Sequence, residues 1–345
     1  MSYLANILEQ PAVLRSQLQT YKEHEVWQHI QQAGKTDQTV VLTGMGASYN
    51  ALYPTWFYLH QQGIPAVHIE ASELIYYSDS LLRQRCLLVV VSQSGNSVEI
   101  GRIIERIQAS GSQPFMISVT TGSDNNLAAH STVQLCTQAG AEVGVATKTY
   151  TSTLLLLHWL GRAIAGQLQP DDYVAVDAIA TSTATILENW QTWIEPAYHQ
   201  LQGTTYAALM GRGPSLTSAL NGGLILKEAV RLPAEGFSGG RFRHGPMELL
   251  SPHVGCIVFT TPGKTLELSQ RLATDIVERG GQLVTIGDAI SSTQPHAHLP
   301  LPETDEALSP ILEILGPQLL AAKLAEQRGL TPGEFRWSGK VIHTE

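Results

Sequence analysis

A run of hydroxyl and amide side chains is the part of this sequence best suited to bind an anion. The run is Ser92-Gln93-Ser94-Gly95-Asn96-Ser97, which follows an apolar segment over 85–91 and precedes a helical pattern over 98–109. A turn from a buried strand into a helix presents backbone N–H groups and the positive end of the helix dipole to an anion. Gly95 permits close approach of the backbone. The pattern favours a phosphate site, and the alternative that the residues alone leave open is an ordinary polar turn.

An earlier turn carries related chemistry. Gly44-Met45-Gly46-Ala47-Ser48-Tyr49 leaves an apolar strand pattern over 39–44 and enters a helix. Its two glycines begin like a dinucleotide-binding fingerprint, and Glu70 stands near the place of the acid that binds a ribose. Tyr49 replaces the third glycine, where bulk blocks the contact between helix and strand. We therefore expect Ser48 to add a hydroxyl to the phosphate site, and an NAD-dependent dehydrogenase is the weaker interpretation.

Composition limits the ligand classes and the location. The chain has 345 residues, 43 % of them apolar and 15 % charged, with a formal net charge of −9. An acidic chain without Lys/Arg clusters is a poor candidate for nucleic acid or an anionic membrane. Cys86, Cys136 and Cys256 lack the spacing of a metal site or a redox pair and are expected in the core. The N-terminus has no signal-peptide pattern, and the apolar helical stretch over 153–166 is too short to span a bilayer. We expect a cytoplasmic protein that uses no metal and no cofactor.

The chain repeats its own pattern of strands and helices. Strand patterns over 39–44, 85–91 and 115–119 recur over 206–211, 255–260 and 283–286. Gly44 corresponds to Gly211, 167 residues later, and Gly95 corresponds to Gly263, 168 residues later. Alternating strands and helices predict parallel sheets covered by helices, with ligands at the carboxyl ends of the strands. The sequence therefore predicts an α/β protein with two tandem doubly wound lobes and flanking helices.

The expected domain limits follow from this repeat. We expect an N-terminal helical segment over 1–34, a first lobe with the phosphate loop over 35–165, connecting helices over 166–204, and a second lobe with a C-terminal tail over 205–345. In the second lobe the serine-rich loop has become Thr260-Thr261-Pro262-Gly263-Lys264-Thr265. Because Pro262 removes an N–H donor, we expect one phosphate site per chain, in the first lobe.

These motifs resemble those of the SIS (sugar isomerase) family. The resemblance is closest to the isomerase half of glutamine–fructose-6-phosphate amidotransferase, and stand-alone amino-sugar-phosphate deaminases and fructosamine deglycases are related to it. It extends from Glu9 to the last residue and is carried by segments 46–50, 70–73, 92–97, 145–150, 226–228, 234–235 and 242–246 and the tail around Lys340. It implies a sugar phosphate contacted by Ser48, Ser92, Gln93, Ser94, Ser97, Val145 and Thr147.

The same resemblance implies three catalytic residues. Glu228 matches the general base that moves a proton between C1 and C2, and its apolar helical neighbours suit such a base because burial raises a carboxyl pKa. His244 matches the group that opens the sugar ring, supplied by the neighbouring subunit of a homodimer. Lys340 matches a lysine that forms a Schiff base, on a tail that closes over the site. Without the resemblance, each would be interpreted as an ordinary surface or loop side chain.

The chain also departs from the family pattern. Asn221, Ile225 and Glu228 share one helix face, where the amidotransferase carries Glu, Lys and Glu. Arg241 replaces the acid that usually precedes the His-Gly-Pro loop. The sequence starts at the isomerase half without a glutaminase domain, so we do not expect it to release ammonia from glutamine.

The sequence thus predicts a phosphosugar enzyme of a particular kind. We expect aldose–ketose isomerisation with amine removal or transfer on an amino- or amine-substituted hexose 6-phosphate, as a deaminase/isomerase or a deglycase. A non-catalytic sugar-phosphate sensor is the alternative. The sugar, the amine and the direction of the reaction stay open.

Overall fold

The chain folds into two compact units. The computed structural model describes residues 2–35, 38–337 and 339–342. The first-lobe unit comprises Ala12–Glu142, Lys148–Asp177 and Trp337–Glu345. The second-lobe unit comprises Met1–Pro11, Val143–Thr147 and Ala178–Arg336. Each lobe is therefore completed by segments that are distant from it in the sequence.

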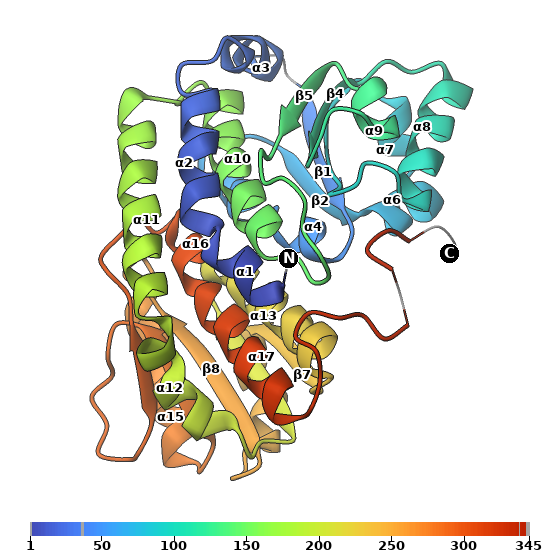
Figure 1. Cartoon of the computed structure of the whole chain (residues 1–345). Coiled ribbons are helices and arrows are strands. Elements are labelled where there is room, and N and C mark those ends of the chain that lie inside the picture. The colour runs from blue at the N-terminus through green and yellow to red at the C-terminus, as the bar shows by residue number, and fades with distance from the viewer. Residues whose placement is uncertain (1, 36–37, 338, 343–345) are drawn as a thin grey trace. The chain divides into compact units, whose positions relative to one another are not determined.

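The first-lobe unit contains a five-stranded parallel sheet in the order β2-β1-β3-β4-β5. Its strands are β1 (Thr39–Gly44), β2 (Ala66–Glu70), β3 (Cys86–Val91), β4 (Phe115–Thr120) and β5 (Val133–Cys136). Every residue of β3 is buried, as expected for a central strand of a parallel sheet with both faces covered. Helices α6 (Ala71–Tyr77), α7 (Ser80–Arg83) and α8 (Val98–Ser110) lie on one face of the sheet, and their apolar side chains join those of β1 and β3 in one core cluster (Figure 1).

The other helices of this unit complete its core. They are α3 (Val26–Gly34), α4 (Gly46–Asn50), α5 (Tyr53–Gln61), α9 (Asn126–Ala129), α10 (Lys148–Ile164) and most of α2 (Gln10–Tyr21). Apart from Arg162, all of α10 is buried, so this apolar helix lies in the core of the unit. The Arg162 guanidinium donates to Asp172 Oδ1 at 2.6 Å. Helix α11 (Pro170–Glu188) begins in this unit and ends in the other.

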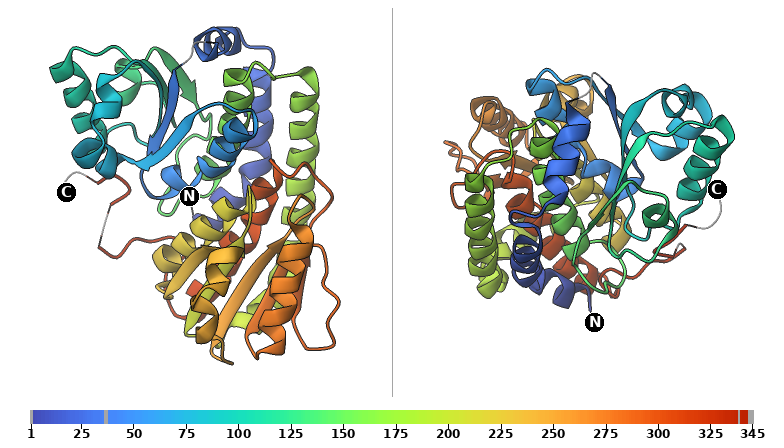
Figure 2. Two further views of the ribbon diagram at one scale, coloured as in Figure 1. Left: turned by 180° about the vertical axis from the view of Figure 1, so that it is seen from behind. Right: turned by 90° about the horizontal axis from the view of Figure 1, so that it is seen from above.

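The second-lobe unit repeats the same topology. Its parallel sheet has the order β10-β9-β8-β6-β7, which is the order of the first sheet when it is read from β7. The strands are β6 (Tyr206–Gly211), β7 (Ala234–Ser238), β8 (Val254–Thr260), β9 (Gln282–Gly287) and β10 (Ala297–Pro300). They run side by side in the yellow to orange part of the chain (Figure 2). The predicted repeat of an α/β lobe is therefore confirmed.

The helices of the second-lobe unit surround this sheet. They are α1 (Tyr3–Leu8), α12 (Trp190–Leu201), α13 (Ser215–Val230), α14 (Gly239–Arg243), α15 (Leu266–Glu278), α16 (Ser309–Glu313) and α17 (Leu315–Gln327), with a 3-10 turn η1 (Pro246–Leu249). Phe237 and Phe242, from β7 and α14, pack with the apolar side chains of β8 and α15.

Two further expectations concern the core and membranes. Cys86 and Cys256 are buried as predicted, whereas Cys136 is only half-buried because it ends the edge strand β5. Within residues 2–35, 38–337 and 339–342, we find no helix that combines the length and the apolar character needed to cross a membrane.

Candidate active site

The first lobe has its topological switch point between β1 and β3. Chain order reverses there, because β2 lies beyond β1 while β4 lies beyond β3. Ligands of doubly wound sheets bind in the crevice at the carboxyl ends of the two strands at such a point. The loop that carries Ser48 follows β1, and the loop that begins at Ser92 follows β3. The two loops predicted from the sequence therefore leave the sheet at the same place.

Gly44 brings Ser48 against the end of β3. Gly44 pairs with Val91 in the parallel register. A Cβ atom on Gly44 would lie 2.9 Å from the Val91 carbonyl oxygen and 3.2 Å from Ser48 Cβ. Only glycine fits between these groups, so the Ser48 side chain sits beside the start of the serine-rich loop.

Tyr49, in the turn after β1, packs against His68 of β2. Its ring stacks on His68 at 4.0 Å, and the His68 Nε2 atom hydrogen-bonds the Tyr49 carbonyl at 3.0 Å. Burial lowers the pKa of His68 to about 4, so the ring is neutral and donates this bond. Helix α4 is only five residues long, and the chain turns into α5 soon after it. This arrangement suits a short turn that presents Ser48 better than a long helix aimed at a pyrophosphate.

Internal hydrogen bonds fix the shape of the serine-rich loop. Ser92 Oγ accepts the Gly95 N–H at 3.1 Å, and Ser94 Oγ accepts the Asn96 N–H at 3.2 Å. Gly95 has φ of +65°, and a Cβ there would lie 1.9 Å from Asn125 Oδ1. Gln93 is tied to the chain after β4 by a bond from its Nε2 to Thr121 Oγ1 at 3.2 Å. The loop is thus preorganised, and glycine is required at its centre.

The loop leads into the N-terminus of α8. Ser97 is the N-cap, and its side chain makes no capping hydrogen bond. A polar hollow of about 340 Å³ lies beside this helix end, lined by Asn96, Ser97, Val98, Gly101, Arg102, Glu105 and Asn126. The start of a helix attracts anions, and the hollow is lined by one basic and one acidic side chain of α8, Arg102 and Glu105. Of the predicted phosphate residues, Ser97 lines this hollow, while Ser92, Gln93 and Ser94 precede it in the same loop.

The C-terminal tail contacts the same unit at two points. The Val98 N–H, in the first turn of α8, donates to the Ile342 carbonyl at 3.1 Å. Lys340 Nζ donates to the Glu142 carbonyl and to Glu142 Oε2, both at 2.9 Å. The Glu142 side chain is wholly buried and also accepts the Thr149 N–H at 3.1 Å. In this structure the predicted Schiff-base lysine thus forms an ion pair with a buried glutamate.

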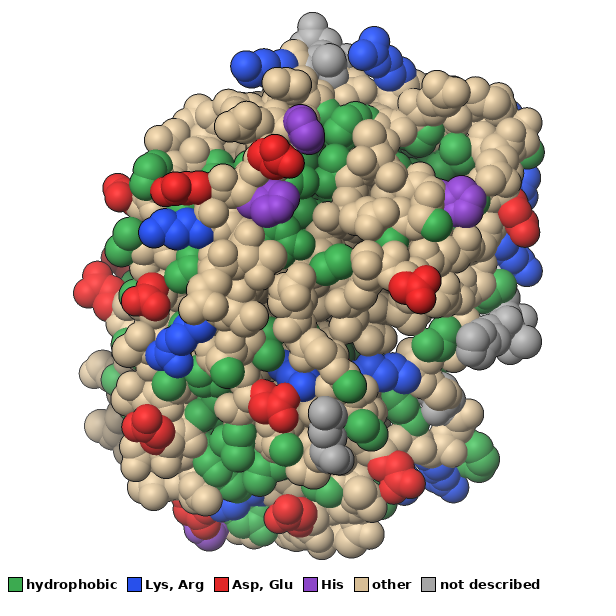
Figure 3. Space-filling view, turned by 45° about the horizontal axis from the view of Figure 1, so that its top comes forward, with side chains coloured by type: hydrophobic (Ala, Val, Ile, Leu, Met, Phe, Trp, Pro, Cys, Tyr) green, Lys and Arg blue, Asp and Glu red, His purple; other side chains and the backbone are tan. Residues whose placement is uncertain are grey.

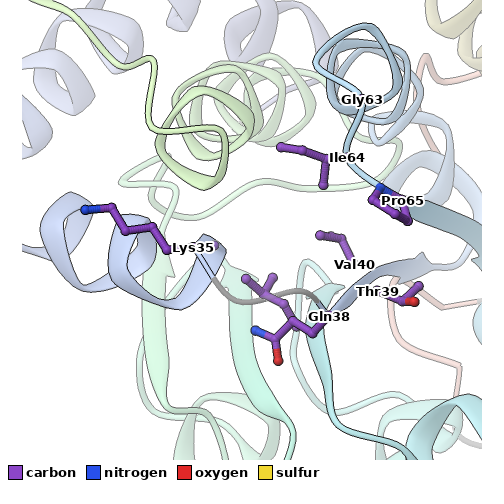
Figure 4. A pocket seen from close by; sticks show the side chains of 9 residues that line it. Lys35, Gln38, Thr39, Val40, Gly63, Ile64 and Pro65 are labelled. Carbon is purple, nitrogen blue, oxygen red and sulfur yellow. The ribbon is translucent and has the colours of Figure 1, made fainter.

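A separate cavity of the first-lobe unit lies at the opposite end of the sheet. It has a volume of about 440 Å³, and Lys35, Gln38 and Ile64 are among the side chains around it (Figure 4). These residues lie where the chain enters β1 and approaches β2. Amino ends of parallel strands are not where such folds bind ligands, so this cavity is not the candidate site.

Glu228 lies near the end of α13 in the second-lobe unit. Its helical neighbours Ile225, Leu226 and Ala229 are buried, while Lys227 is exposed. Burial raises the pKa of Glu228 to about 7, and the positive charge of Lys227 opposes this effect. A carboxyl group with a pKa near neutrality can both accept and return a proton at physiological pH.

The helix face around Glu228 has lost its other ionisable groups. Asn221 and Ile225 are each 1 % exposed, so the predicted shared face is directed into the protein. Neither the amide oxygen nor the amide nitrogen of Asn221 has a hydrogen-bond partner among the described residues. With Ile225 in place of a lysine, no cation on this face stabilises the Glu228 carboxylate, in agreement with its raised pKa.

Glu228 and His244 lie at opposite ends of β7. Glu228 is two residues from the end of α13, and the chain then enters β7 at Ala234. His244 is exposed and follows α14, which begins directly after the carboxyl end of β7. A five-residue strand spans about 16 Å. The two predicted catalytic side chains of one chain are therefore not brought together.

Two carboxylates of the chain itself fill the second-lobe switch point. Glu306 Oε1 accepts the Lys264 N–H at 3.2 Å, and its carboxyl group leaves no room for a side chain on Gly263. Glu313 is 0 % exposed and accepts bonds from the hydroxyls of Ser215 at 2.7 Å, Ser218 at 2.5 Å, Thr261 at 2.6 Å and Ser309 at 3.0 Å. Burial raises the pKa of Glu313, and these hydroxyl groups oppose the rise.

Val145 and Thr147 belong to the second-lobe unit. Both are buried, and the Val145 N–H donates to the Gly333 carbonyl at 3.1 Å. Gly144 has φ of +75°, and a Cβ there would lie 2.0 Å from the same carbonyl. Within the described part of the chain, no group of three or more His, Cys, Asp or Glu side chains is arranged to hold a metal ion.

Sequence reasoning missed the buried partner of Lys340. Glu142 is 198 residues away in the sequence, and nothing in its local pattern distinguishes it from a solvated acid. It also missed Arg102, although a cation one turn into the helix after the serine-rich loop was a signal that could have been used.

The fold and these loops define a two-lobed α/β protein with a phosphate-type loop in its first lobe. Residues 35–162 and 204–325 match the SIS domain. These two segments cover more than half of the chain. The chain therefore belongs to the SIS domain family.

Similar proteins extend this finding. The glutamine–fructose-6-phosphate aminotransferase (isomerizing) of Pyrococcus horikoshii is 29 % identical over 99 % of this chain. The chain spans only 57 % of the length of that relative. The C-terminal domain of glucosamine-fructose-6-phosphate aminotransferase from Francisella tularensis has a similar fold, with a TM-score of 0.83, 19 % identity and coverage of 97 % of this chain and 98 % of that one. Glucosamine-6-phosphate deaminase from Thermotoga maritima superposes with a TM-score of 0.79, 20 % identity and full coverage of both chains.

Proposed function

We propose that this protein is an enzyme that isomerises an amino- or amine-substituted hexose 6-phosphate and removes or transfers its amine. The observation that carries the proposal is the pKa of Glu228, which burial raises to about 7. Moving a proton between C1 and C2 of an open-chain sugar needs a base that also returns the proton. A carboxylate in an apolar setting meets this need without a metal or a cofactor.

The serine-rich loop supports the choice of a phosphorylated substrate. Ser92, Gln93, Ser94 and Ser97 form the loop, and Ser48 approaches its start. The net charge of −9 requires that an anion be held locally, by N–H groups and hydroxyls. On the face drawn in Figure 3, the Lys and Arg side chains are dispersed among Asp and Glu and form no broad basic surface. Val145 and Thr147 are assigned to the substrate site by family resemblance alone.

The second lobe supports a single phosphate site per chain. Its equivalent loop faces Glu306, whose negative charge would repel a phosphate. One relative is named as an isomerizing glutamine–fructose-6-phosphate aminotransferase and one neighbour of the same fold as a glucosamine-6-phosphate deaminase, which favours an enzyme over a sensor. A cytoplasmic location belongs to the same proposal, because three cysteines without disulfides suit a reducing compartment.

The positions of Glu228 and His244 support a homodimer with a shared site. Because β7 separates them within one chain, a site that uses both takes His244 from a second chain. Two inactive variants, Glu228→Gln and His244→Ala, should then regain part of the activity after subunit exchange. Continued inactivity after exchange has been verified by mass spectrometry would contradict the shared site.

The test of the reaction is a proton NMR time course with glucosamine 6-phosphate in D₂O. Loss of the C2 proton signal, absent with Glu228→Gln, is the expected result, and release of fructose 6-phosphate would identify amine removal. Exchange that persists in Glu228→Gln would exclude Glu228 as the base. Tight binding without any exchange would favour a deglycase that acts on bulkier amine adducts. The second candidate is a sugar-phosphate sensor. Two observations support it: Ile225 stands where the amidotransferase has a lysine, and Lys340 is paired with Glu142.

A further inference from the structure

Another cavity of the first-lobe unit lies where α2, α3, α10 and α11 meet. It has a volume of about 280 Å³ and is bounded by the turn between α2 and α3, the C-terminal end of α10 and the first turn of α11. Helix α3 lies near the ends of α2 and α10, at the top of Figure 1. All the residues that line the cavity belong to the first-lobe unit, and none of them is part of the candidate active site.

Buried aromatic side chains line one side of this cavity. Trp27 is 5 % exposed and Tyr173 is 6 % exposed, and both border the cavity. The Trp159 ring contacts both of them, with centroids 6.1 Å from Trp27 and 5.5 Å from Tyr173. Trp27 Nε1 also donates to the Tyr21 carbonyl at 2.8 Å, so the indole is fixed in place. Aromatic side chains of this kind attract organic cations.

The turn between α10 and α11 forms a second, well-fixed wall. Asp172 accepts the Gln169 N–H at 2.8 Å through Oδ2, and its Oδ1 atom accepts from Arg162. Gly166 has φ of +69°, and a Cβ there would lie 3.3 Å from Gln31 Nε2. The turn is therefore held by hydrogen bonds, and its glycine leaves space for the Gln31 amide group.

Glu23 supplies a carboxylate without a basic partner. It lines the cavity, and its side chain forms no ion pair within the part of the chain that the structure describes. Burial raises the pKa of Tyr173, and the negative charges of Asp172 and Glu23 add to the rise, while a hydrogen bond with the Glu23 backbone opposes it. The Glu23 carboxylate therefore lies near the Tyr173 hydroxyl.

The other side chains around the cavity leave this negative charge uncompensated. Among the described residues, no lysine or arginine lines the cavity. His24 does line it, but its Nδ1 atom accepts the Val26 N–H at 3.1 Å, so that nitrogen carries no proton and the ring is neutral in this arrangement.

The backbone of Glu23 is itself unusual. Its φ is +56°, in the left-handed region, directly after the end of α2. Glycine is the residue that commonly takes this position after a helix, because a Cβ atom is unfavourable there. Backbone strain of this kind is typical of positions that clamp a ligand. A glutamate where glycine would fit better favours a role for its carboxylate.

Two amide groups add acceptors around the cavity. Gln28 and Gln31 are three residues apart on α3 and so lie on one face of the helix. Neither side chain has a hydrogen-bond partner within residues 2–35, 38–337 and 339–342. With the Glu23 carboxylate, their amide oxygens make three acceptor groups, which equals the number of N–H donors on a primary ammonium group.

We propose that this cavity binds a small primary amine in its protonated form. The ammonium group is bound by the Glu23 carboxylate and by the amide oxygens of Gln28 and Gln31, and the apolar part of the amine packs against Trp27 and Tyr173. An alkylamine is protonated at neutral pH, because its pKa lies near that of lysine, about 10.4. The site is separate from the serine-rich loop and does not depend on the proposed reaction.

The test is isothermal titration calorimetry on the whole chain at pH 7 and constant ionic strength. The charged probe is n-butylammonium chloride, and the neutral probe is 1-butanol, which has the same carbon chain. Each is titrated into the wild type, Glu23→Gln and Glu23→Gly. The matched control is Glu25→Gln, which removes an exposed carboxylate two residues away that does not line the cavity.

We expect n-butylammonium to bind the wild type and Glu25→Gln equally well. Glu23→Gln should weaken binding roughly 10-fold, the lower end of the range for charged hydrogen bonds, because Glu23 is exposed. Glu23→Gly should bind as weakly as Glu23→Gln, and because glycine suits the φ of this position, unfolding would not account for the loss. The wild type should bind 1-butanol at least about 10-fold more weakly than n-butylammonium.

Three results would overturn the site. The first is no binding of n-butylammonium to the wild type, or equal affinity for the wild type and Glu23→Gln. The second is equal weakening in Glu25→Gln and Glu23→Gln, which would indicate a general attraction of cations to an acidic surface. The third is equal binding of the two probes by the wild type, which would mean that the cavity recognises the carbon chain and not the ammonium group.

Discussion

Replacing Glu228 by glutamine should change how the stability of the protein depends on pH. Burial raises the pKa of this carboxyl group from 4.5 to about 7 in the folded state. The folded protein therefore binds the proton more tightly than the unfolded chain, and stability falls as pH rises from about 4.5 to about 7. Each tenfold change in proton affinity corresponds to about 1.4 kcal/mol, which gives a penalty of at most about 3.5 kcal/mol at pH 8. Partial exposure of the side chain reduces this to about 2 kcal/mol.

The assay is urea denaturation of the wild type and Glu228→Gln at pH 5 and pH 8. We expect the free energy of unfolding of Glu228→Gln, relative to that of the wild type, to rise by about 2 kcal/mol between the two pH values. The matched control is Glu278→Gln, an exposed glutamate at the end of α15, which should show little change. If the free energies of unfolding of the wild type and Glu228→Gln differed by the same amount at both pH values, Glu228 would not be a buried carboxyl group with a raised pKa. The main support for Glu228 as the base would then be lost.

Other changes test the loop and the tail. Gly95→Ala should lower the free energy of unfolding by roughly 2 kcal/mol and abolish binding of a sugar phosphate, because φ is +65° and the Cβ would meet Asn125. Gly101→Ala, in the open on α8, should instead be neutral or stabilise by up to about 1 kcal/mol, and equal effects of the two changes would contradict the argument. Glu142→Gln should release the tail, seen as several-fold faster trypsin cleavage after Lys340, and an unchanged cleavage rate would show that this ion pair does not hold the tail.

The central strands could be predicted because their own residues are apolar, as expected for buried strands. All six residues of β3 and all seven of β8 are buried, so each reads as a continuous apolar run. The strands that sequence reasoning did not name, β2, β5, β7 and β10, lie at the sheet edges, where His68, Gln134 and Glu235 interrupt the apolar pattern. Edge strands are short and half-exposed, and their pairing depends on the neighbouring strand more than on their own residues.

The candidate site, like the sheets, could be predicted from the sequence only in part. The serine-rich loop was predictable because the strand, the hydroxyls, Gly95 and the following helix are contiguous in the sequence. The pairing of Lys340 with Glu142 was not, because it joins residues 198 positions apart through tertiary packing.

The two lobes show how one topology can keep or lose an anion site. Both sheets have the same strand order, and Ser48 and Ser215 follow their first strands at corresponding places. In the first lobe the loop hydroxyls bond to their own backbone, so they can turn toward a ligand at little cost. In the second lobe the Ser215 hydroxyl already donates to the buried Glu313, and Glu306 faces the loop at Gly263. A phosphate would have to displace the buried Glu313 carboxyl group from its four hydroxyl partners, so the switch point of the second lobe is closed to an anion.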